Sequence, residues 1–376
     1  MPWDYQSKRC CLLYKKELTA IKRANRLRER EVFSDDLLDF ASNDYLGLSQ
    51  NKELLKRAYE RVLEYKYHSP KASMLVNGYH QVHKEFESYM SKLCGFEESI
   101  VVGSGYLANI ALIESMVRRD DVLLLDSEFH ASGVMASKLA LGATFTFSHN
   151  DEKDLEKLLK SLNYKRAIIC VEGVYSMEGD LVNPEIFEVA DRYEAILIVD
   201  EAHSSGTVGK NLLGVFDLYD IEPKKNHIKM ATLGKAVGSY GAYIQGSTEI
   251  VSYLINRAKS IIYSTAPSVF DIALAHEGYK YIQKNRDSFL QKKDEIYALV
   301  EKKFKITPTS LILKLEYGDN QKVLNLKEVA KKEGFLIGAI RPPTVKSAIV
   351  RIILRLNHDR KDLERLFAIF DNQQKK

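Results

Sequence analysis

Short, unbroken apolar runs alternate with amphipathic helical segments between about residues 80 and 235. Three of these runs are VLLLD at 122–126, AIICVE at 167–172 and AILIVD at 195–200. Strands that are apolar at every position are buried on both faces, and helices between successive strands are typical of parallel sheets. We therefore predict an α/β fold with a mostly parallel central sheet and helices on both of its faces.

In a sheet of this kind, ligands bind beyond the carboxyl ends of the strands. The polar residues that follow each apolar run are therefore the first place to look for a functional site. We expect these side chains to meet at one edge of the sheet. They lie at 103–106, 126–130, 172–176, 200–203 and 232–235.

The pattern changes towards both ends of the chain, which predicts three parts. Residues 1–45 are expected to form a basic helix and an extended segment, and residues 46–268 a large domain that contains the parallel sheet. Residues 269–376 are expected to form a small α+β domain, in which a long charged helix at about 270–304 leads into short alternating strands.

The predicted N-terminal helix is strongly basic. Residues 8–30 carry nine Lys or Arg side chains against two Glu, and leucines and an isoleucine recur near helical spacing. One interpretation is a helix that packs by its leucines and exposes a solvated basic face. A transit peptide, a membrane-surface helix and a phosphate-binding face for an anionic substrate have the same pattern.

Composition excludes several classes of protein. Apolar residues make up 45% of the chain and charged residues 28%, which is typical of globular proteins. No run approaches the ~18 apolar residues that a membrane helix needs, and a net charge of +4 does not indicate nucleic-acid binding. The four cysteines lack C-x-x-C spacing, so neither a metal site nor a disulfide framework is predicted. The first residues contain no signal-peptide core, and we expect a soluble, cytoplasmic protein.

A glycine-rich turn follows the apolar run at 98–102. Gly103, Gly105 and Ala108 have the spacing of a dinucleotide-binding fingerprint, and Asp126 follows Gly105 by 21 residues, where a ribose-binding acid would lie. A nicotinamide dehydrogenase is therefore one hypothesis. Glycine-rich strand-to-helix turns also bind other phosphates through free backbone N–H groups and the helix dipole.

A second group of residues predicts a different cofactor. Asp200 ends an apolar run and His203 follows three residues later, while Lys235 lies in a turn between Gly234 and Gly238. Pyridoxal phosphate needs a lysine for a Schiff base and a carboxylate that keeps its pyridine nitrogen protonated. Each residue alone is commonly structural, and their combination is what indicates the cofactor.

Eight strings occur in the order in which one enzyme family carries them. They are SNDYLGLS (42–49), GSGYLANIALI (103–113), DSEFHAS (126–132), EGVYSMEGD (172–180), VDEAHSSGTVG (199–209), TLGKAVG (232–238), IYST (262–265) and AIRPPTV (339–345). On these strings the chain resembles the α-oxoamine synthases, pyridoxal-phosphate enzymes that join an amino acid to an acyl thioester with loss of CO2. The resemblance implies an aminotransferase-like fold (fold type I) and a homodimer with shared active sites.

The resemblance also implies roles for individual residues at the cofactor. Lys235 matches the lysine that forms the Schiff base, Asp200 the carboxylate at the pyridine nitrogen, and His130 the histidine stacked on the ring. All three are expected to be catalytic. Further cofactor contacts are expected from Ser176 and His203 at the phenolic oxygen, from Gly105, Tyr106 and Thr232 at the phosphate, and from Thr265 across the subunit interface.

Four residues match positions that contact substrates in the family. Arg351 matches the arginine that holds the amino-acid carboxylate, with Arg355 as its competitor, and Asn43 matches a residue near that carboxylate. Arg28 and Thr344 match contacts to the acyl substrate. The AIRPPTV string most resembles the branch that condenses L-alanine with a pimeloyl thioester, of coenzyme A or of an acyl carrier protein, in biotin biosynthesis. Branches that use another acyl group or amino acid are the alternative.

The implied reaction makes two demands on these residues. Lys235 is expected to have a depressed pKa in cationic, partly desolvated surroundings, so that its amine can take a proton. His130 is expected to hydrogen-bond a developing oxyanion. The chain departs from the family at HSPKASMLVNGYH (68–80), where Met74 occupies a position that is frequently arginine, and at Ala236, where glycine is usual.

Overall fold

The computed structural model describes residues 14–24, 26–28 and 30–374 of the chain. Two compact units are present, Met1–Leu38 and Asp39–Lys376. Among the helices of this described part, none is both long enough and apolar enough to cross a membrane.

The first unit contains one described helix, α1 (Lys15–Arg23). The basic helix predicted over residues 8–30 is therefore shorter than expected, since the described residues beyond Ala24 have no regular structure up to residue 34. Residues 8–13 lie outside the described part. No residue of α1 is buried, and short helices without tertiary packing on an apolar face are only marginally stable in water.

The second unit contains a seven-stranded sheet whose strand order is β2-β8-β7-β6-β5-β3-β4. Strands β3 to β7 pair in parallel, whereas β8 is antiparallel to both of its neighbours. The predicted mostly parallel sheet is therefore confirmed. The strands are β2 (Glu98–Val102), β3 (Val122–Asp126), β4 (Ala143–Phe147), β5 (Ala167–Glu172), β6 (Ile196–Asp200), β7 (His227–Thr232) and β8 (Ala242–Gly246).

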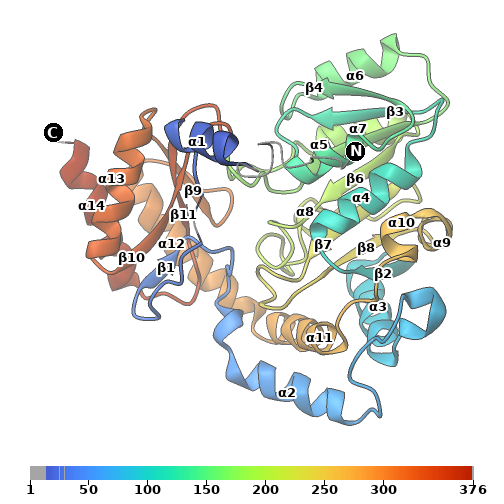
Figure 1. The fold of residues 1–376 in the computed structure, drawn as a ribbon, viewed down its shortest axis with the longest axis horizontal. Helices are drawn as coiled ribbons and strands as arrows, with labels where there is room; N and C mark the ends of the chain where they lie inside the picture. The colour runs from blue at the N-terminus through green and yellow to red at the C-terminus, as the bar shows by residue number, and fades with distance from the viewer. Residues whose placement is uncertain (1–13, 25, 29, 375–376) are drawn as a thin grey trace, which may run out of the picture. The chain divides into compact units, whose positions relative to one another are not determined.

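Helices lie on both faces of this sheet, as Figure 1 shows. Their bounds are α2 (Lys52–Leu63), α3 (Gln81–Cys94), α4 (Gly105–Met116), α5 (Ala131–Ser137), α6 (Glu152–Ser161), α7 (Glu185–Arg192), α8 (Val215–Leu218), α9 (Thr248–Arg257) and α10 (Lys259–Ile262). Two short helical turns, η1 (Leu48–Gln50) and η2 (Met74–Gly78), flank α2 in sequence.

Alternation along the strands decides which helix covers which face. Alternate strand residues, such as Leu123, Leu125 and Ile198, join one buried cluster with apolar residues of α4, α5, α9 and α10. The intervening residues point to the other face, because successive side chains of a strand alternate. On that face Phe86 of α3 contacts Tyr243, and α7 packs on β6. The prediction of helices on both faces is confirmed.

A second sheet has four strands in the order β1-β10-β11-β9. The pairs β10–β11 and β11–β9 are antiparallel. Its strands are β1 (Leu38–Phe40), β9 (Ile312–Glu316), β10 (Phe335–Ile340) and β11 (Ile349–Ile353), and its helices are α13 (Asn320–Lys332) and α14 (Arg360–Gln374). The domain boundaries proposed at residues 45 and 268 stay predictions.

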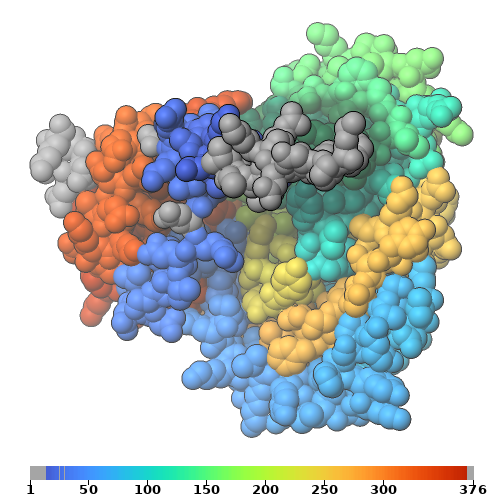
Figure 2. Space-filling view, in the orientation of Figure 1, coloured from blue at the N-terminus to red at the C-terminus, as the bar shows by residue number. Residues whose placement is uncertain are grey.

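Two helices replace the single long helix predicted at about 270–304. They are α11 (Val269–Lys284) and α12 (Arg286–Phe304), separated at Asn285. The Asn285 amide group donates to the carbonyl of Tyr281, and asparagine favours such local bonds over a continuous helix. Helix α11 packs on α2, and the two lie side by side at the lower edge of Figure 2.

Candidate functional site

The polar residues at the carboxyl ends of the parallel strands meet, as the sequence predicted. Lys235 lies three residues beyond β7, and its Nζ is 2.7 Å from Nε2 of His203, which lies three residues beyond β6. His203 Nδ1 is 2.5 Å from the hydroxyl of Tyr45. Both ring nitrogens of His203 are thus engaged in a buried chain of hydrogen bonds that leads to the lysine amine.

Burial of Lys235 favours its neutral form. Burial lowers the pKa of Lys235 to about 8 against the opposing effect of the Asp200 and Glu172 carboxyl groups, and the charge of Arg351 adds to the lowering. Burial, together with the Lys235 and Arg351 charges, also keeps the pKa of His203 well below its ordinary value. The direction agrees with the expected depressed lysine pKa, and burial rather than a cationic environment is its main cause.

Asp200 is held rigidly at the end of β6. It is 4% exposed. Its Oδ2 accepts a hydrogen bond from Asn109 Nδ2 at 2.9 Å, and its Oδ1 accepts one from the backbone N–H of Ala202 at 3.0 Å. Asn109 also donates to Ser132 Oγ at 2.8 Å. A buried carboxylate with two fixed N–H donors keeps one orientation, so it presents a defined negative charge to a ligand.

His130 is the N-cap residue of α5, and its hydrogen bonds select one tautomer. Both the backbone N–H and the hydroxyl of Ser132 lie within reach of Nδ1, at 3.2 and 2.7 Å. Because the backbone N–H can only donate, Nδ1 is an acceptor and the neutral ring carries its proton on Nε2. The ring keeps an exposed face, yet the surrounding protein and the Lys235 charge lower the pKa of His130 against the pull of Asp200.

The residues predicted to bind a phosphate lie at the beginning of α4. Ser104 caps this helix by accepting from the N–H of Leu107. A Cβ atom added to Gly105 would lie 3.8 Å from Cβ of Thr232, so these two residues are side by side. Tyr106 is exposed on the first turn. Free N–H groups and the helix dipole make such a terminus suitable for an anion.

The two candidate arginines, Arg351 and Arg355, have different partners. Arg355 is buried and forms ion pairs with Asp39 and Asp44 at 2.9 and 2.7 Å. Arg351, in β11, donates to the Ser176 carbonyl at 2.7 Å and to Asn43 Oδ1 at 3.1 Å. No ion pair links Arg351 to a carboxylate of the described residues, so its guanidinium remains suited to a carboxylate ligand.

Three predicted site residues are not brought to this cluster by any contact of the described chain. Thr265 and Thr344 are exposed in loops. Arg28 is exposed and belongs to the first unit. Their roles at the interface and at the acyl substrate stay predictions. The unusual loop at 68–80 forms the turn η2, and the Ala72 carbonyl accepts from the N–H of Ala266, beside Thr265.

Sequence reasoning missed three residues of the cluster: Tyr45, Asn109 and Glu172. Tyr45 and Asn109 lie within strings that pointed to the family, but nothing in their type distinguishes them from core residues. Glu172 ends β5 and pairs in register with Asp200. In the sequence, the only available signal was that the two apolar runs end in a carboxylate each. The register of the strands then shows that these two carboxyl groups are neighbours.

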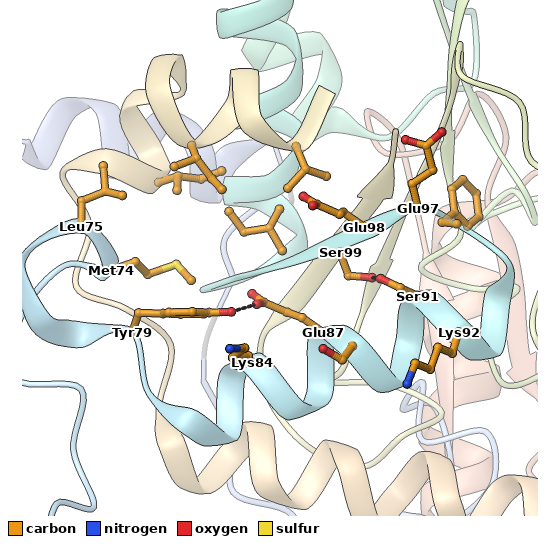
Figure 3. Close-up of a pocket in the computed structure, with 16 residues that line it drawn as sticks. Met74, Leu75, Tyr79, Lys84, Glu87, Ser91, Lys92, Glu97, Glu98 and Ser99 are labelled. Carbon is orange, nitrogen blue, oxygen red and sulfur yellow. Dashed lines mark hydrogen bonds between the residues drawn. The ribbon is translucent and has the colours of Figure 1, made fainter. Parts of the chain in front are cut away.

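A cavity of about 540 Å³ lies elsewhere, and no predicted site residue lines it. Figure 3 shows its polar wall, where the Tyr79 hydroxyl donates to Glu87 Oε2 at 2.5 Å. Burial raises the pKa of Glu87 to about 7, against the hydrogen bonds from Tyr79 and the N–H of Val101. The described residues that line this cavity include no histidine and no arginine. The cavity is separate from the cluster around Lys235.

Comparisons with known proteins agree with this geometry. A family model described as aminotransferase class I and II matches residues 35–370. The curated 8-amino-7-oxononanoate synthase of Helicobacter pylori (strain ATCC 700392 / 26695) is 42% identical over 359 residues, which cover 94% of this chain and 95% of that protein. The crystal structure of 8-amino-7-oxononanoate synthase from Francisella tularensis is 26% identical, with a TM-score of 0.76 over 91% of this chain and 99% of that one.

A variant of serine palmitoyltransferase from S. paucimobilis, solved with a bound PLP–myriocin aldimine, is also similar. Its TM-score is 0.85 at 20% identity, over 95% of this chain and 96% of that chain. At this identity the likeness concerns the fold alone. It agrees with the predicted aminotransferase-like fold.

Proposed function

The chain belongs to the aminotransferase class I and II family and, within it, to the 8-amino-7-oxononanoate synthases, and on this basis we propose that it condenses L-alanine with a pimeloyl thioester. The products are 8-amino-7-oxononanoate, CO2 and the free thiol of coenzyme A or of an acyl carrier protein, in biotin biosynthesis. One observation carries the proposal: Lys235, with its pKa lowered to about 8, lies among Asp200, His203 and Arg351 at the carboxyl edge of the sheet.

Pyridoxal phosphate is the cofactor, and the described residues fit it. Lys235 Nζ would hold its aldehyde group, and the fixed carboxylate of Asp200 would hold its pyridine nitrogen. The exposed ring of His130 would cover one face, with the N–H groups at Gly105 and the hydroxyl of Thr232 for the phosphate. When bound, the cofactor supplies an electron sink for the bond that is broken at the amino-acid α-carbon.

The amine of Lys235 acts as the base in this proposal. A pKa of about 8 leaves an appreciable neutral fraction near pH 7.5, whereas an ordinary lysine would be almost fully charged. The neutral amine takes the α-proton and later returns a proton to the product. His203 and Tyr45 hold the amine in place through the chain of hydrogen bonds described above.

Arg351 orients the amino acid by binding its carboxylate. Its guanidinium is fixed by the Ser176 carbonyl and by Asn43, so the remaining N–H groups point in a defined direction. A bidentate arginine–carboxylate pair fixes both position and rotation of the substrate. The competitor Arg355 is already bound to Asp39 and Asp44, which supports Arg351 as the substrate residue.

His130 stabilises the charge that develops on the thioester oxygen. Its Nδ1 is engaged by Ser132, so Nε2 carries a proton that can be donated. A pre-oriented donor at such an oxygen lowers the barrier because no reorganisation is needed during the reaction. Asp200 would contribute by keeping its negative charge beside the pyridine nitrogen of the cofactor.

The proposal includes a homodimer with shared active sites. Several large apolar side chains near α4 and α5 are exposed in the single chain, and such surfaces mark interaction sites in folded proteins. Leu139, Leu141 and Tyr263 line one hollow of about 300 Å³, and Tyr263 is two residues from Thr265. The exposed apolar residues are Tyr106, Val134, Met135, Leu139, Leu141, Tyr240 and Tyr263. A cytoplasmic location is part of the same proposal.

The dimer is tested by mixing two variants. Lys235→Ala and Thr265→Ala are each expected to lose activity, and mixed dimers carry one site in which both residues are intact. Activity of the mixture above the sum of the two variants supports shared sites. A monomer by light scattering, or no gain on mixing, would contradict them.

Thiol release tests the reaction itself. The purified protein is incubated with pyridoxal phosphate and L-alanine, and pimeloyl-coenzyme A is compared with the palmitoyl and acetyl thioesters and with pimeloyl carrier protein. Release with a pimeloyl thioester alone supports the proposal, and Lys235→Ala should show none. Preference for another acyl chain would move the enzyme to another α-oxoamine synthase activity. Turnover in Lys235→Ala would refute the assigned chemistry.

A further inference from the structure

Glu172 is a second carboxyl group at the cluster, and no role has been assigned to it above. It is the last residue of β5 and pairs in register with Asp200, the last residue of β6. Residues paired in a parallel ladder point to the same face. That face is the one covered by α4, since Cys170 and Ile198, two residues earlier on each strand, belong to the cluster that contains α4.

The two oxygens of Glu172 differ in their surroundings. The residue is 2% exposed. Its Oε2 accepts from the backbone N–H of Ser176 at 3.1 Å. Its Oε1 is buried and has no hydrogen-bond partner among the described residues. Buried polar atoms are nearly always paired, and an unpaired one calls for a missing partner such as a ligand.

Burial, with two neighbouring negative charges, favours the neutral form of this carboxyl group. Burial raises the pKa of Glu172 well above its ordinary value, and the negative charges of Asp200 and Asp126 add to this. The charge of Lys235 and the N–H of Ser176 oppose the rise. Tyr45 and Tyr175 also interact with Glu172, and burial keeps their phenols neutral by raising their pKa.

The hydrogen bonds also indicate which oxygen carries the proton. Asp200 receives two N–H donors, whereas Glu172 receives one, and N–H donors favour the charged form of a carboxyl group. Since Ser176 donates to Oε2, that oxygen is an acceptor. The proton of Glu172 is then on Oε1, and an O–H group without an acceptor needs one.

We propose that Glu172 is a cofactor-binding residue that carries a proton on Oε1 and donates it to an acceptor oxygen of bound pyridoxal phosphate. The inference rests on the proposed function for the identity of the ligand, and on the geometry of the chain for the proton. A neutral Glu172 leaves Asp200 as the single negative charge beside Lys235. An ionised Glu172 would raise the pKa of Lys235 and so reduce the fraction of neutral amine that is available to take a proton.

The protonation of Glu172 is tested by measuring urea unfolding of the cofactor-free protein between pH 5 and 8. The unfolded carboxyl ionises near pH 4.5, whereas the folded one stays neutral, so the parent protein loses stability relative to Glu172→Gln as pH rises. The ratio of the two unfolding constants should grow by up to about tenfold per pH unit for as long as the folded carboxyl keeps its proton. A ratio that stays constant from pH 5 to 7 would overturn the proposal.

Glu87→Gln is the matched control for this measurement. Glu87 is a buried carboxyl outside the cluster, and its pKa is raised to about 7. The ratio of the unfolding constants of the parent protein and Glu87→Gln should grow in the same way up to about pH 7 and then level off. The control therefore shows that the assay detects a buried, protonated glutamate.

The hydrogen bond is tested by absorbance titration of the cofactor-free proteins with pyridoxal phosphate. Glu172→Gln keeps an N–H donor and should bind within about threefold of the parent, whereas Glu172→Leu should bind about tenfold more weakly, a change of ~1.4 kcal/mol. Glu87→Gln should bind as the parent does. Equal affinity of Glu172→Leu and the parent, or of both Glu172 variants, would overturn the hydrogen bond.

The two readouts separate the inference from the proposed function. If the parent protein itself fails to bind pyridoxal phosphate, the proposed function and the hydrogen bond fall together. The pH dependence of unfolding does not involve the cofactor, so it still decides whether Glu172 carries a proton.

Discussion

His149 joins the end of β3 to the segment 173–180 at the edge of the site through two ionic hydrogen bonds. Its Nδ1 is 2.9 Å from Asp126 Oδ1 at the end of β3, and its Nε2 is 2.9 Å from Asp180 Oδ2. Asp180 ends the segment 173–180 that contains Ser176, whose carbonyl accepts from Arg351. Both ring nitrogens face carboxylates, so the arrangement requires the doubly protonated ring.

The charged ring contributes stability that depends on pH. Burial alone would lower the pKa of His149, but Asp126 and Asp180 overcome it and raise the pKa from 6.5 to about 10. A rise of this size corresponds to about 5 kcal/mol in full. Because His149 is 27% exposed and Asp180 is 41% exposed, solvent screening reduces the expected contribution to about 2–3 kcal/mol.

The direction of this pH dependence follows from the raised pKa of His149. The contribution is complete below pH 6.5, where the ring is charged in both states, and it is lost as pH rises towards 10. We therefore expect His149→Gln to lower the free energy of unfolding by about 2–3 kcal/mol at pH 6. The loss should shrink steadily at pH 8 and nearly vanish at pH 10, as measured by urea unfolding.

His276→Gln is the control for this measurement. Burial lowers the pKa of His276 to about 4, so that ring is neutral above pH 7 in both states. Its substitution should change stability by an amount that is constant between pH 7 and 10. A loss for His149→Gln that is equally constant from pH 6 to 10 would refute the assignment of charge to His149.

Three further substitutions test the site and its support. Arg351→Lys should raise the KM for L-alanine about 10- to 100-fold, because lysine cannot form a bidentate pair; an unchanged KM in steady-state assays would exclude Arg351 as the carboxylate ligand. Arg355→Met should lower the free energy of unfolding by about 3 kcal/mol, because the buried Asp44 and the half-buried Asp39 lose their partner, and an unshifted urea midpoint would contradict this. Asn109→Leu removes a donor to Asp200 and should weaken pyridoxal phosphate binding about tenfold; equal absorbance titrations would show that Asn109 does not hold Asp200.

The sheet and the meeting of its strand ends were predictable from local patterns. Apolar runs without alternation imply strands buried on both faces, and parallel strands have their carboxyl ends at the same edge. The approach of Lys235 and His203, which are 32 residues apart, follows from that rule alone. Helix lengths were less predictable, since the basic pattern at 8–30 continues beyond the last residue of α1 at Arg23.

The choice between Arg351 and Arg355 depended on tertiary structure. Arg351 is the middle residue of β11 and Arg355 lies two residues beyond its end, with the same side-chain chemistry. The resemblance favoured Arg351, and the contacts of Arg355 with Asp39 and Asp44, more than 300 residues earlier, supply the physical reason. The charge on His149 and the proposed proton on Glu172 likewise depend on tertiary structure. Each is the balance between burial and charges from strands that are distant in sequence, and that balance exists only once the chain has folded, because in the unfolded chain water solvates each group separately.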